Sequence, residues 1–113
     1  MTPAFLVPEI AVSAQGRGPI LGIGSPLPLL VTLGILEVVE QESLDLELWQ
    51  SAGGSEWGVK PIAKFPQKFY KGTHQMVAAP SEPFLQARWH VNRWGRGNMT
   101  PHFRLYVFIE PQG

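Results

Sequence analysis

The chain has 113 residues, of which 44% are hydrophobic, and it carries no net charge and no cysteine. This length and apolar fraction suit one domain around a single core, and the absence of cysteine excludes disulfides and thiolate metal sites. Eleven prolines and twelve glycines, against 16% charged residues, indicate short segments separated by turns and favour an all-β class over long helices.

The charges are separated along the sequence. Residues 1–59 carry one basic and seven acidic side chains, a net −6, whereas residues 60–113 carry eight basic and two acidic side chains, a net +6. If strands of the two halves interleave, opposite charges pair across strands on solvent faces, each pair contributing about 0.2–1 kcal/mol. The alternative is an acidic face that meets a basic face of a neighbouring subunit, which would orient a head-to-tail assembly.

The first 19 residues are expected to form an N-terminal arm with one strand at Phe5–Ser13. Pro8 confines that strand to a sheet edge, because proline has no N–H to donate to a neighbour. Residues 20–113 are expected to form the sandwich domain, beginning with a short strand at Ile20–Ile23.

The central part of the chain predicts three further strands. Leu29–Glu40 is apolar almost throughout, which is typical of a strand buried on both faces, and Gly34 within it predicts a bulge. Leu44–Gln50 alternates with a period of two, as half-buried strands do. Glycines in residues 51–55 then predict a turn into a returning strand at Trp57–Ile62.

The last part of the chain predicts a long loop and three strands. Lys64–Gly72 has no clear period and is the expected loop, followed by a strand at Thr73–Ala78. Residues 85–94 and 101–110 both alternate and are expected to pair as the final hairpin. The eight expected strands predict a single-domain antiparallel β-sandwich that resembles a jelly roll.

Residues for catalysis or metal binding are few. His74, His90 and His102 are scattered singly, and no His-Glu-x-x-His motif or cluster of aspartates occurs. His90 and His102 would lie close in the expected final hairpin, but without a carboxylate beside them they make a poor metal site. No serine stands in a Gly-x-Ser-x-Gly context. We therefore expect a protein that is not an enzyme and has no metal or cofactor.

Aromatic residues are the one enriched class, with four Trp, six Phe and two Tyr. Trp89 and Phe103 fall on apolar strand faces and are expected in the core. The others are too many for so small a core, and exposed aromatic area is typical of a binding surface. The candidates for an interface or a ligand site are Trp57, Phe65, Phe69, Tyr70, Trp94, Arg93 and Arg96.

The aromatic residues leave the ligand open. Lysines interleaved with the loop aromatics would suit single-stranded nucleic acid, but the zero net charge and the acidic first half argue against it. A carbohydrate-binding module is the stronger alternative, with Trp57, Phe69, Tyr70 or Trp94 stacking on sugar rings. Asn92 and Asn98, together with the candidate arginines, would supply polar partners for such a sugar.

Several segments together resemble a group of small β-sandwich proteins from bacteriophage and prophage structural regions. The resemblance covers about residues 29–110. The segments that carry it are Leu-Asp-Leu-Glu-Leu-Trp-Gln-Ser at 44–51, Glu56-Trp57, Lys64-Phe65-Pro66-Gln67, Leu-Gln-Ala-Arg-Trp-His-Val at 85–91 and Thr-Pro-His-Phe-Arg-Leu-Tyr-Val at 100–107. Gly53-Gly54 stands where the group often has Asp-Gly. The resemblance implies a non-enzymatic part of a particle or tail, which decorates a shell or joins subunits.

The leading hypothesis is therefore a structural, virion-type β-sandwich that acts through protein–protein contacts, as a homo-oligomer or with another structural protein. A glycan is the alternative partner. The apolar stretch before Pro8 has no basic region ahead of it, so a secretory signal is not indicated, and no apolar run is long enough to span a bilayer. We expect a soluble protein with no membrane partner, in the cytoplasm or on a virion.

Overall fold

A computed structural model describes residues 2–12, 15–38, 42–67, 71–93 and 103–112, with the backbone alone at 42, 92 and 93. These residues form nine strands. The strands are β1 (Ala4–Val12), β2 (Gly16–Arg17), β3 (Leu21–Gly22), β4 (Leu29–Val38), β5 (Glu42–Ser51), β6 (Ala63–Lys64), β7 (Gly72–Ala78), β8 (Phe84–Arg93) and β9 (Phe103–Pro111). The described part of the chain contains no helix with the length and hydrophobicity needed to cross a membrane.

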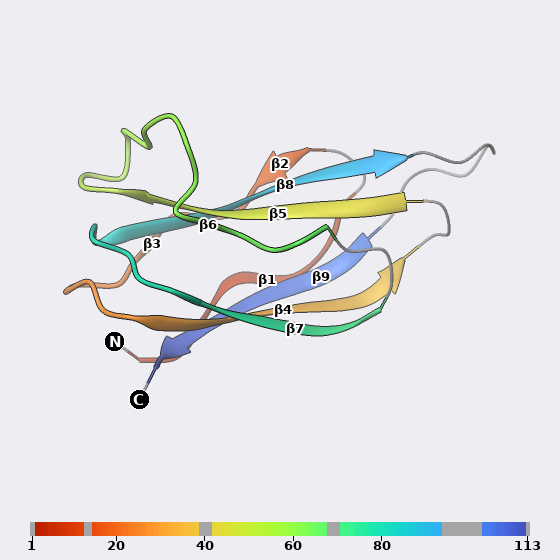
Figure 1. The fold of residues 1–113 in the computed structure, drawn as a ribbon, viewed down its shortest axis with the longest axis horizontal. Coiled ribbons are helices and arrows are strands. Elements are labelled where there is room, and N and C mark those ends of the chain that lie inside the picture. The colour runs from red at the N-terminus through yellow and green to blue at the C-terminus, as the bar shows by residue number, and fades with distance from the viewer. Residues whose placement is uncertain (1, 13–14, 39–41, 68–70, 94–102, 113) are drawn as a thin grey trace.

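The strands form two sheets that lie face to face (Figure 1). Sheet A has the order β1-β9-β4-β7, and sheet B has the order β2-β8-β5-β6 with β3 also paired to β8. β2 was not expected from the sequence; it pairs with β8, as β3 does, and the described residues hold nine strands where eight were predicted. The chain passes repeatedly from one sheet to the other, as in a jelly roll, so the predicted fold class is confirmed.

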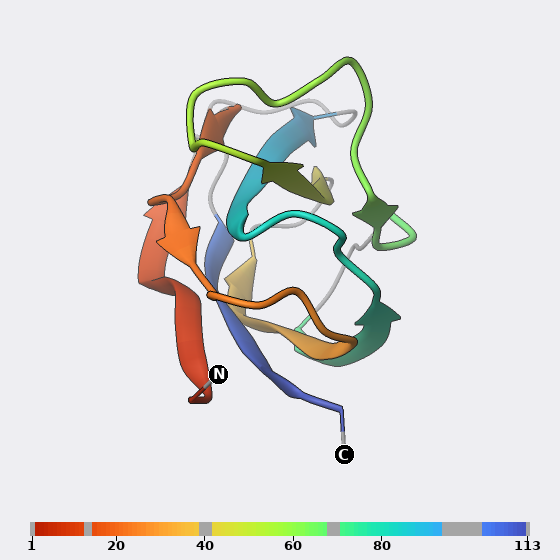
Figure 2. The ribbon, with the colours of Figure 1, turned by 90° about the vertical axis from the view of Figure 1, so that its left-hand side faces the viewer.

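The two sheets lie face to face (Figure 2), and the buried side chains of both sheets form the core between them. In β9 the alternate residues Phe103, Leu105, Val107 and Ile109 are fully buried, while the residues between them are half-buried on the outside. The apolar residues of β5 follow the same alternation. Period two therefore identified the inner faces of these strands, and Phe103 and Trp89 lie in the core as expected.

One expectation for β4 is wrong. Its first half alternates instead of being buried on both faces, so that Leu30 and Thr32 lie on the outside of sheet A. Gly34 is buried on that outer side because the ring of Tyr106 on β9 lies over it. The bulge follows slightly later, between Ile35 and Glu37, and leaves Leu36 exposed.

The expected final hairpin is also wrong. β8 pairs with β5, β2 and β3 in sheet B, whereas β9 pairs with β1 and β4 in sheet A. Each of these strands has one apolar face. That face is buried both in a hairpin and when the two strands lie in opposite sheets of a sandwich, so the alternation does not distinguish the two arrangements. The predicted proximity of His90 and His102 loses its basis, and His102 lies outside the described residues.

The returning strand lies later than predicted. Trp57–Ile62 forms bends and irregular backbone, and the paired strand β6 is confined to Ala63–Lys64, with single backbone hydrogen bonds from Ile62 and Phe65 to β5 on either side of it. Gly58 has a positive φ of 75° and Pro61 lacks an N–H, so this segment does not pair continuously. The loop expected from Lys64 thus begins after β6, and its residues 68–70 lie outside the described part.

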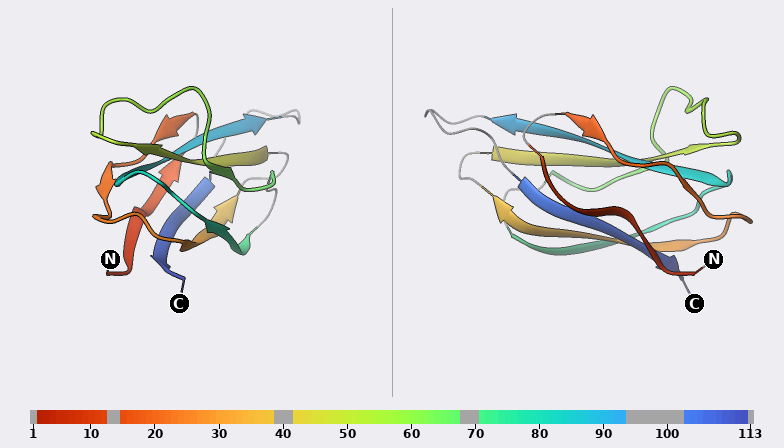
Figure 3. Two further views of the ribbon diagram at one scale, coloured as in Figure 1. Left: turned by 60° about the vertical axis from the view of Figure 1, so that its left-hand side comes forward. Right: turned by 180° about the vertical axis from the view of Figure 1, so that it is seen from behind.

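The N-terminal strand belongs to the sandwich itself. Among the described strands β1 pairs with β9 alone and occupies one margin of sheet A, as Pro8 requires, and two irregularities interrupt its register. The start of β1 and the end of β9 lie at the same end of sheet A (Figure 3).

Charges of the two halves of the sequence meet across strands. Arg104 lies 3.3 Å from Glu9 and 3.5 Å from Glu37, and Lys64 Nζ lies 3.8 Å from Asp45 Oδ1. Each of these pairs joins a base of the second half to an acid of the first half, so the interleaved arrangement is confirmed for these groups. The head-to-tail contact between subunits stays a prediction.

Candidate functional site

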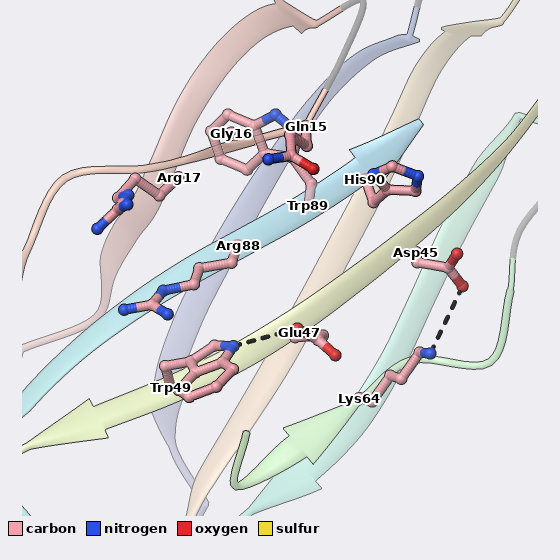
Figure 4. A pocket seen from close by; sticks show the side chains of 10 residues that line it. All are labelled: Gln15, Gly16, Arg17, Asp45, Glu47, Trp49, Lys64, Arg88, Trp89 and His90. Carbon is pink, nitrogen blue, oxygen red and sulfur yellow. Dashed lines mark hydrogen bonds and ion pairs between the residues drawn. The ribbon is translucent and has the colours of Figure 1, made fainter. Parts of the chain in front are cut away.

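The outer face of sheet B carries a hollow of about 590 Å³ that is lined by charged and aromatic side chains (Figure 4). Its centre is a row of outward side chains that runs across four strands. The register places Arg17 opposite Arg88, Arg88 opposite Glu47, and Glu47 opposite Lys64. Three cations in this row flank one carboxylate. A second row places His90 opposite Asp45.

Arg88 lies between two tryptophans. Its guanidinium carbon is 4.3 Å from the ring centre of Trp49 and 5.6 Å from that of Trp57. Both distances fall within the range of cation–π attraction. The indole Nε1 of Trp49 donates a hydrogen bond of 3.2 Å to Glu47 Oε1, which holds that ring on the sheet. β5, β8 and the segment after β5 thus combine to build one aromatic and cationic cluster.

The side chain of Gln86 holds that of Arg88 in position through a hydrogen bond. Arg88 Nε donates to Gln86 Oε1 at 3.2 Å, and Gln86 Nε2 donates to the carbonyl oxygen of Gly18 at 2.9 Å. Gln86 is only 4% exposed, and its two hydrogen bonds are partly buried, which limits competition from water. Burial and the charge of Arg17 lower the pKa of Arg88 from its ordinary value, and Glu47 opposes that shift.

Gly16 lines one side of the hollow, next to the indole of Trp89. A Cβ atom at this position would lie 2.9 Å from Trp89 Nε1 and 3.1 Å from the neighbouring ring carbons. Only glycine leaves room for the indole of Trp89, which is a core residue on β8 and also lines the hollow.

The outer face of sheet A is different in character. Phe5 is 52% exposed and makes edge-on contacts with Tyr106 and Phe108, at ring-centre distances of 5.8 Å and 5.0 Å. Together with Leu36 these rings line an apolar hollow, whose rim includes Glu9.

The other margin of sheet A is the edge of β7. Within the described residues β7 pairs with β4 alone, and Figure 2 shows it on the side of the sheet opposite to β1. Thr73, Gln75 and Val77 are exposed along it, Val77 to 52%. Its seven residues include no Asp, Glu, Lys or Arg, and His74 among them is half-buried.

The predicted site residues do not gather in one place. Trp57 contacts Arg88 at the margin of the hollow on sheet B. Phe65 is a correction, because it is 1% exposed and its side chain fills the core. Arg93 ends β8, but its side chain lies outside the described part, as do Phe69, Tyr70, Trp94 and Arg96.

Sequence reasoning missed Arg17, Glu47, Trp49 and Arg88 as members of one cluster. Alternation placed Arg88 on the outward face of its strand, and Glu47 stood on the polar face of another. The missing information was the order of strands in sheet B, which alone makes these residues neighbours.

Within residues 2–12, 15–38, 42–67, 71–93 and 103–112, no three His, Asp or Glu side chains form a group that could hold a metal ion. The arrangement on sheet B suits binding, because it offers hydrogen-bond donors, acceptors and aromatic surface in one shallow hollow. Comparison with known proteins found no matching family model, no matching curated protein and no matching solved structure.

Proposed function

We propose that this chain is a non-enzymatic structural component, of the phage- or virion-type assembly class that its sequence resembles, and that it joins a second copy of itself through β7. The observation that carries the proposal is the edge of β7. An open strand edge presents backbone N–H and C=O groups that another strand can pair with.

The other strand edges are protected in ways that β7 is not. β1 contains Pro8 and two irregularities of register, both of which oppose pairing with a further strand. The margins of sheet B consist of β2, β3 and β6, which have two residues each, and the stretch of β5 that β6 leaves uncovered carries the charged side chain of Asp45. β7 has seven residues, no proline and no lysine or arginine. It is the edge of the described sandwich best suited to strand addition.

The sequence of β7 suits pairing with itself. In an antiparallel two-fold arrangement centred on Gln75, each Gln75 faces its counterpart and Thr73 faces the partner's Val77. No like charges would meet among these exposed side chains, and the two copies of sheet A would continue as one sheet. Because the two-fold axis uses both β7 edges, assembly through this contact stops at a dimer.

Light scattering over a range of protein concentrations tests the proposal. We expect the mass to rise with concentration and to level at twice the mass of the chain. Gln75→Lys should keep the protein monomeric, because it places two like charges opposite each other at the axis. Gln75 is exposed and loses only a 3.2 Å hydrogen bond to Thr32, so the fold should remain.

Ile10→Lys is the matched control, since it adds the same charge to an exposed position, 42% accessible, on the opposite margin of sheet A. This variant should still dimerise. A native chain that stays monomeric at every concentration would overturn the proposal. A mass that grows beyond two copies would favour the head-to-tail assembly instead.

Carbohydrate binding is the second candidate, and the cluster of Trp49, Arg88 and Trp57 favours it. Sugar sites combine aromatic surface with polar groups in a hollow, as the outer face of sheet B does. A screen of the native protein against neutral and acidic oligosaccharides tests this function. Binding that Trp49→Ala weakens would support it, whereas a protein that binds no member of the panel would refute it.

A further inference from the structure

We propose that the hollow on sheet B takes a sugar that carries a carboxylate, a uronic acid residue, and holds that carboxylate between Arg17 and Arg88. The inference rests on the second function proposed above and specifies its ligand class. It is independent of pairing through β7, because the hollow lies on the outer face of the other sheet.

The first observation is the pair of like charges. Arg17 and Arg88 stand directly opposite each other on β2 and β8, an arrangement that is unfavourable unless an anion lies between them. Within the part of the chain that the structure describes, Arg17 forms no ion pair. Arg88 has Glu47 opposite it, but one oxygen of that carboxylate already accepts the bond from Trp49.

The second observation is that contacts within the protein already fix the position of the Arg88 side chain. Gln86 occupies its Nε, and the tryptophan rings lie 4.3 Å and 5.6 Å from the guanidinium. Its terminal nitrogens remain for an oxyanion, and arginine and carboxylate form short charge-assisted hydrogen bonds. A preorganised side chain loses little conformational entropy when it binds.

The third observation separates a sugar from other anions. Beyond the two arginines the hollow is lined by the carboxylates of Glu47 and Asp45, and by Lys64 (Figure 4). Carboxylates would repel a phosphate or a highly charged peptide, but they accept hydrogen bonds from hydroxyl groups. Lys64 can donate to hydroxyl oxygens. A ligand with one acidic group and several hydroxyls can form hydrogen bonds with each of these side chain types, and the volume of about 590 Å³ suits a small saccharide.

Calorimetric titration with defined oligosaccharides tests the inference. The probes are an oligosaccharide of neutral sugars that ends in a single uronic acid residue, and the methyl ester of the same oligosaccharide, which keeps the rings and removes the charge. We expect an acidic form to bind, the ester to bind about tenfold or more weakly, and affinity for the acid to fall as salt is raised. Poly-glutamate serves as the acidic peptide probe and should not bind.

The variants are Arg17→Gln and Arg88→Gln. Each should lower affinity for the acidic form about tenfold or more and leave the weak affinity for the ester unchanged. Arg17 is exposed on a two-residue strand, so its variant keeps the fold even if Arg88→Gln does not. Lys60→Gln is the control, since it removes an exposed positive charge outside the hollow and should bind like the native chain.

The outcomes separate the inference from the function on which it rests. If the acid and its ester bind equally well, carbohydrate binding stands and the assignment of a charged sugar is overturned. If none of these saccharides binds, the inference is overturned, and carbohydrate binding is overturned as well only when the panel of neutral and acidic oligosaccharides also fails to bind. Binding of poly-glutamate as tight as that of the acidic sugar would reassign the hollow to an acidic protein partner.

Discussion

Gly34 and Tyr106 offer a direct test of how the outer face of sheet A is built. The two residues are opposite each other on β4 and β9. A Cβ atom at Gly34 would lie 2.1 Å from Cε1 and 2.2 Å from Cζ of Tyr106. Carbon atoms in contact lie about 3.5–4.0 Å apart, so Gly34→Ala must displace the ring by about 1.4 Å. That displacement disturbs the edge-on contact of Tyr106 with Phe5.

The expected cost follows from two opposing terms. Forcing an added methyl group into a packed site costs about 1–3 kcal/mol. Alanine is favoured over glycine within a strand by about 0.5–1 kcal/mol. Gly34→Ala should therefore lower the free energy of unfolding by about 1 kcal/mol, and by at most roughly 2.5 kcal/mol. Urea denaturation at equilibrium measures the change.

A double-mutant cycle identifies the cause. In a Tyr106→Ala background nothing remains for the methyl group to displace, so Gly34→Ala should be neutral or slightly stabilising. Gly53→Ala is the control, because no atom lies within 4 Å of its added Cβ. If Gly34→Ala is equally destabilising with and without the tyrosine ring, the steric explanation is refuted.

Three further predictions concern the core, a loop and the surface charges. Leu46 is 1% exposed, so Leu46→Ala should lower the free energy of unfolding by about 2–5 kcal/mol. Leu36 is 40% exposed, so Leu36→Ala should change it by less than about 0.5 kcal/mol. Similar losses for the two variants in urea denaturation would contradict the assigned strand faces. Gln50 Oε1 accepts hydrogen bonds from the N–H groups of Ser81 at 2.8 Å and Glu82 at 3.2 Å. Gln50→Ala should therefore lower the free energy of unfolding by about 1 kcal/mol and speed amide hydrogen exchange at both residues. Gln67→Ala, which removes a hydrogen bond elsewhere, should leave exchange at Ser81 and Glu82 unchanged. Arg104→Gln removes ion pairs of 3.3 Å and 3.5 Å between partly exposed groups, and should cost at most about 1 kcal/mol, with a smaller cost in high salt. A cost for Arg104→Gln that does not change with salt would argue against these ion pairs.

The sequence was sufficient to predict the strand faces because alternation is a local property. β5 and β9 each repeat with period two, and their inner residues could be assigned without knowledge of their neighbours. Pro8 likewise predicted an edge strand from the missing N–H alone. These local signals led to the correct fold class.

The neighbours of each strand could not be predicted in the same way. β8 and β9 follow each other in the chain and both alternate, which suits a hairpin and suits opposite sheets equally well. The burial of Phe65 had no periodic signal either, because it follows the two-residue strand β6 at the end of an irregular segment. The cluster on sheet B required the register of β2, β8, β5 and β6, and Arg17 and Arg88 are far apart in the sequence.

Amide hydrogen exchange at two protein concentrations tests the central claim, that β7 is the contact between copies, most directly. Alternate N–H groups of β7 bond to β4, and the others point to the open edge. We predict that the edge-facing amides of Thr73–Val77 exchange slowly at high concentration and quickly at low concentration, while amides of β1 do not respond. Association of the chain without any change in exchange along β7 would contradict the account.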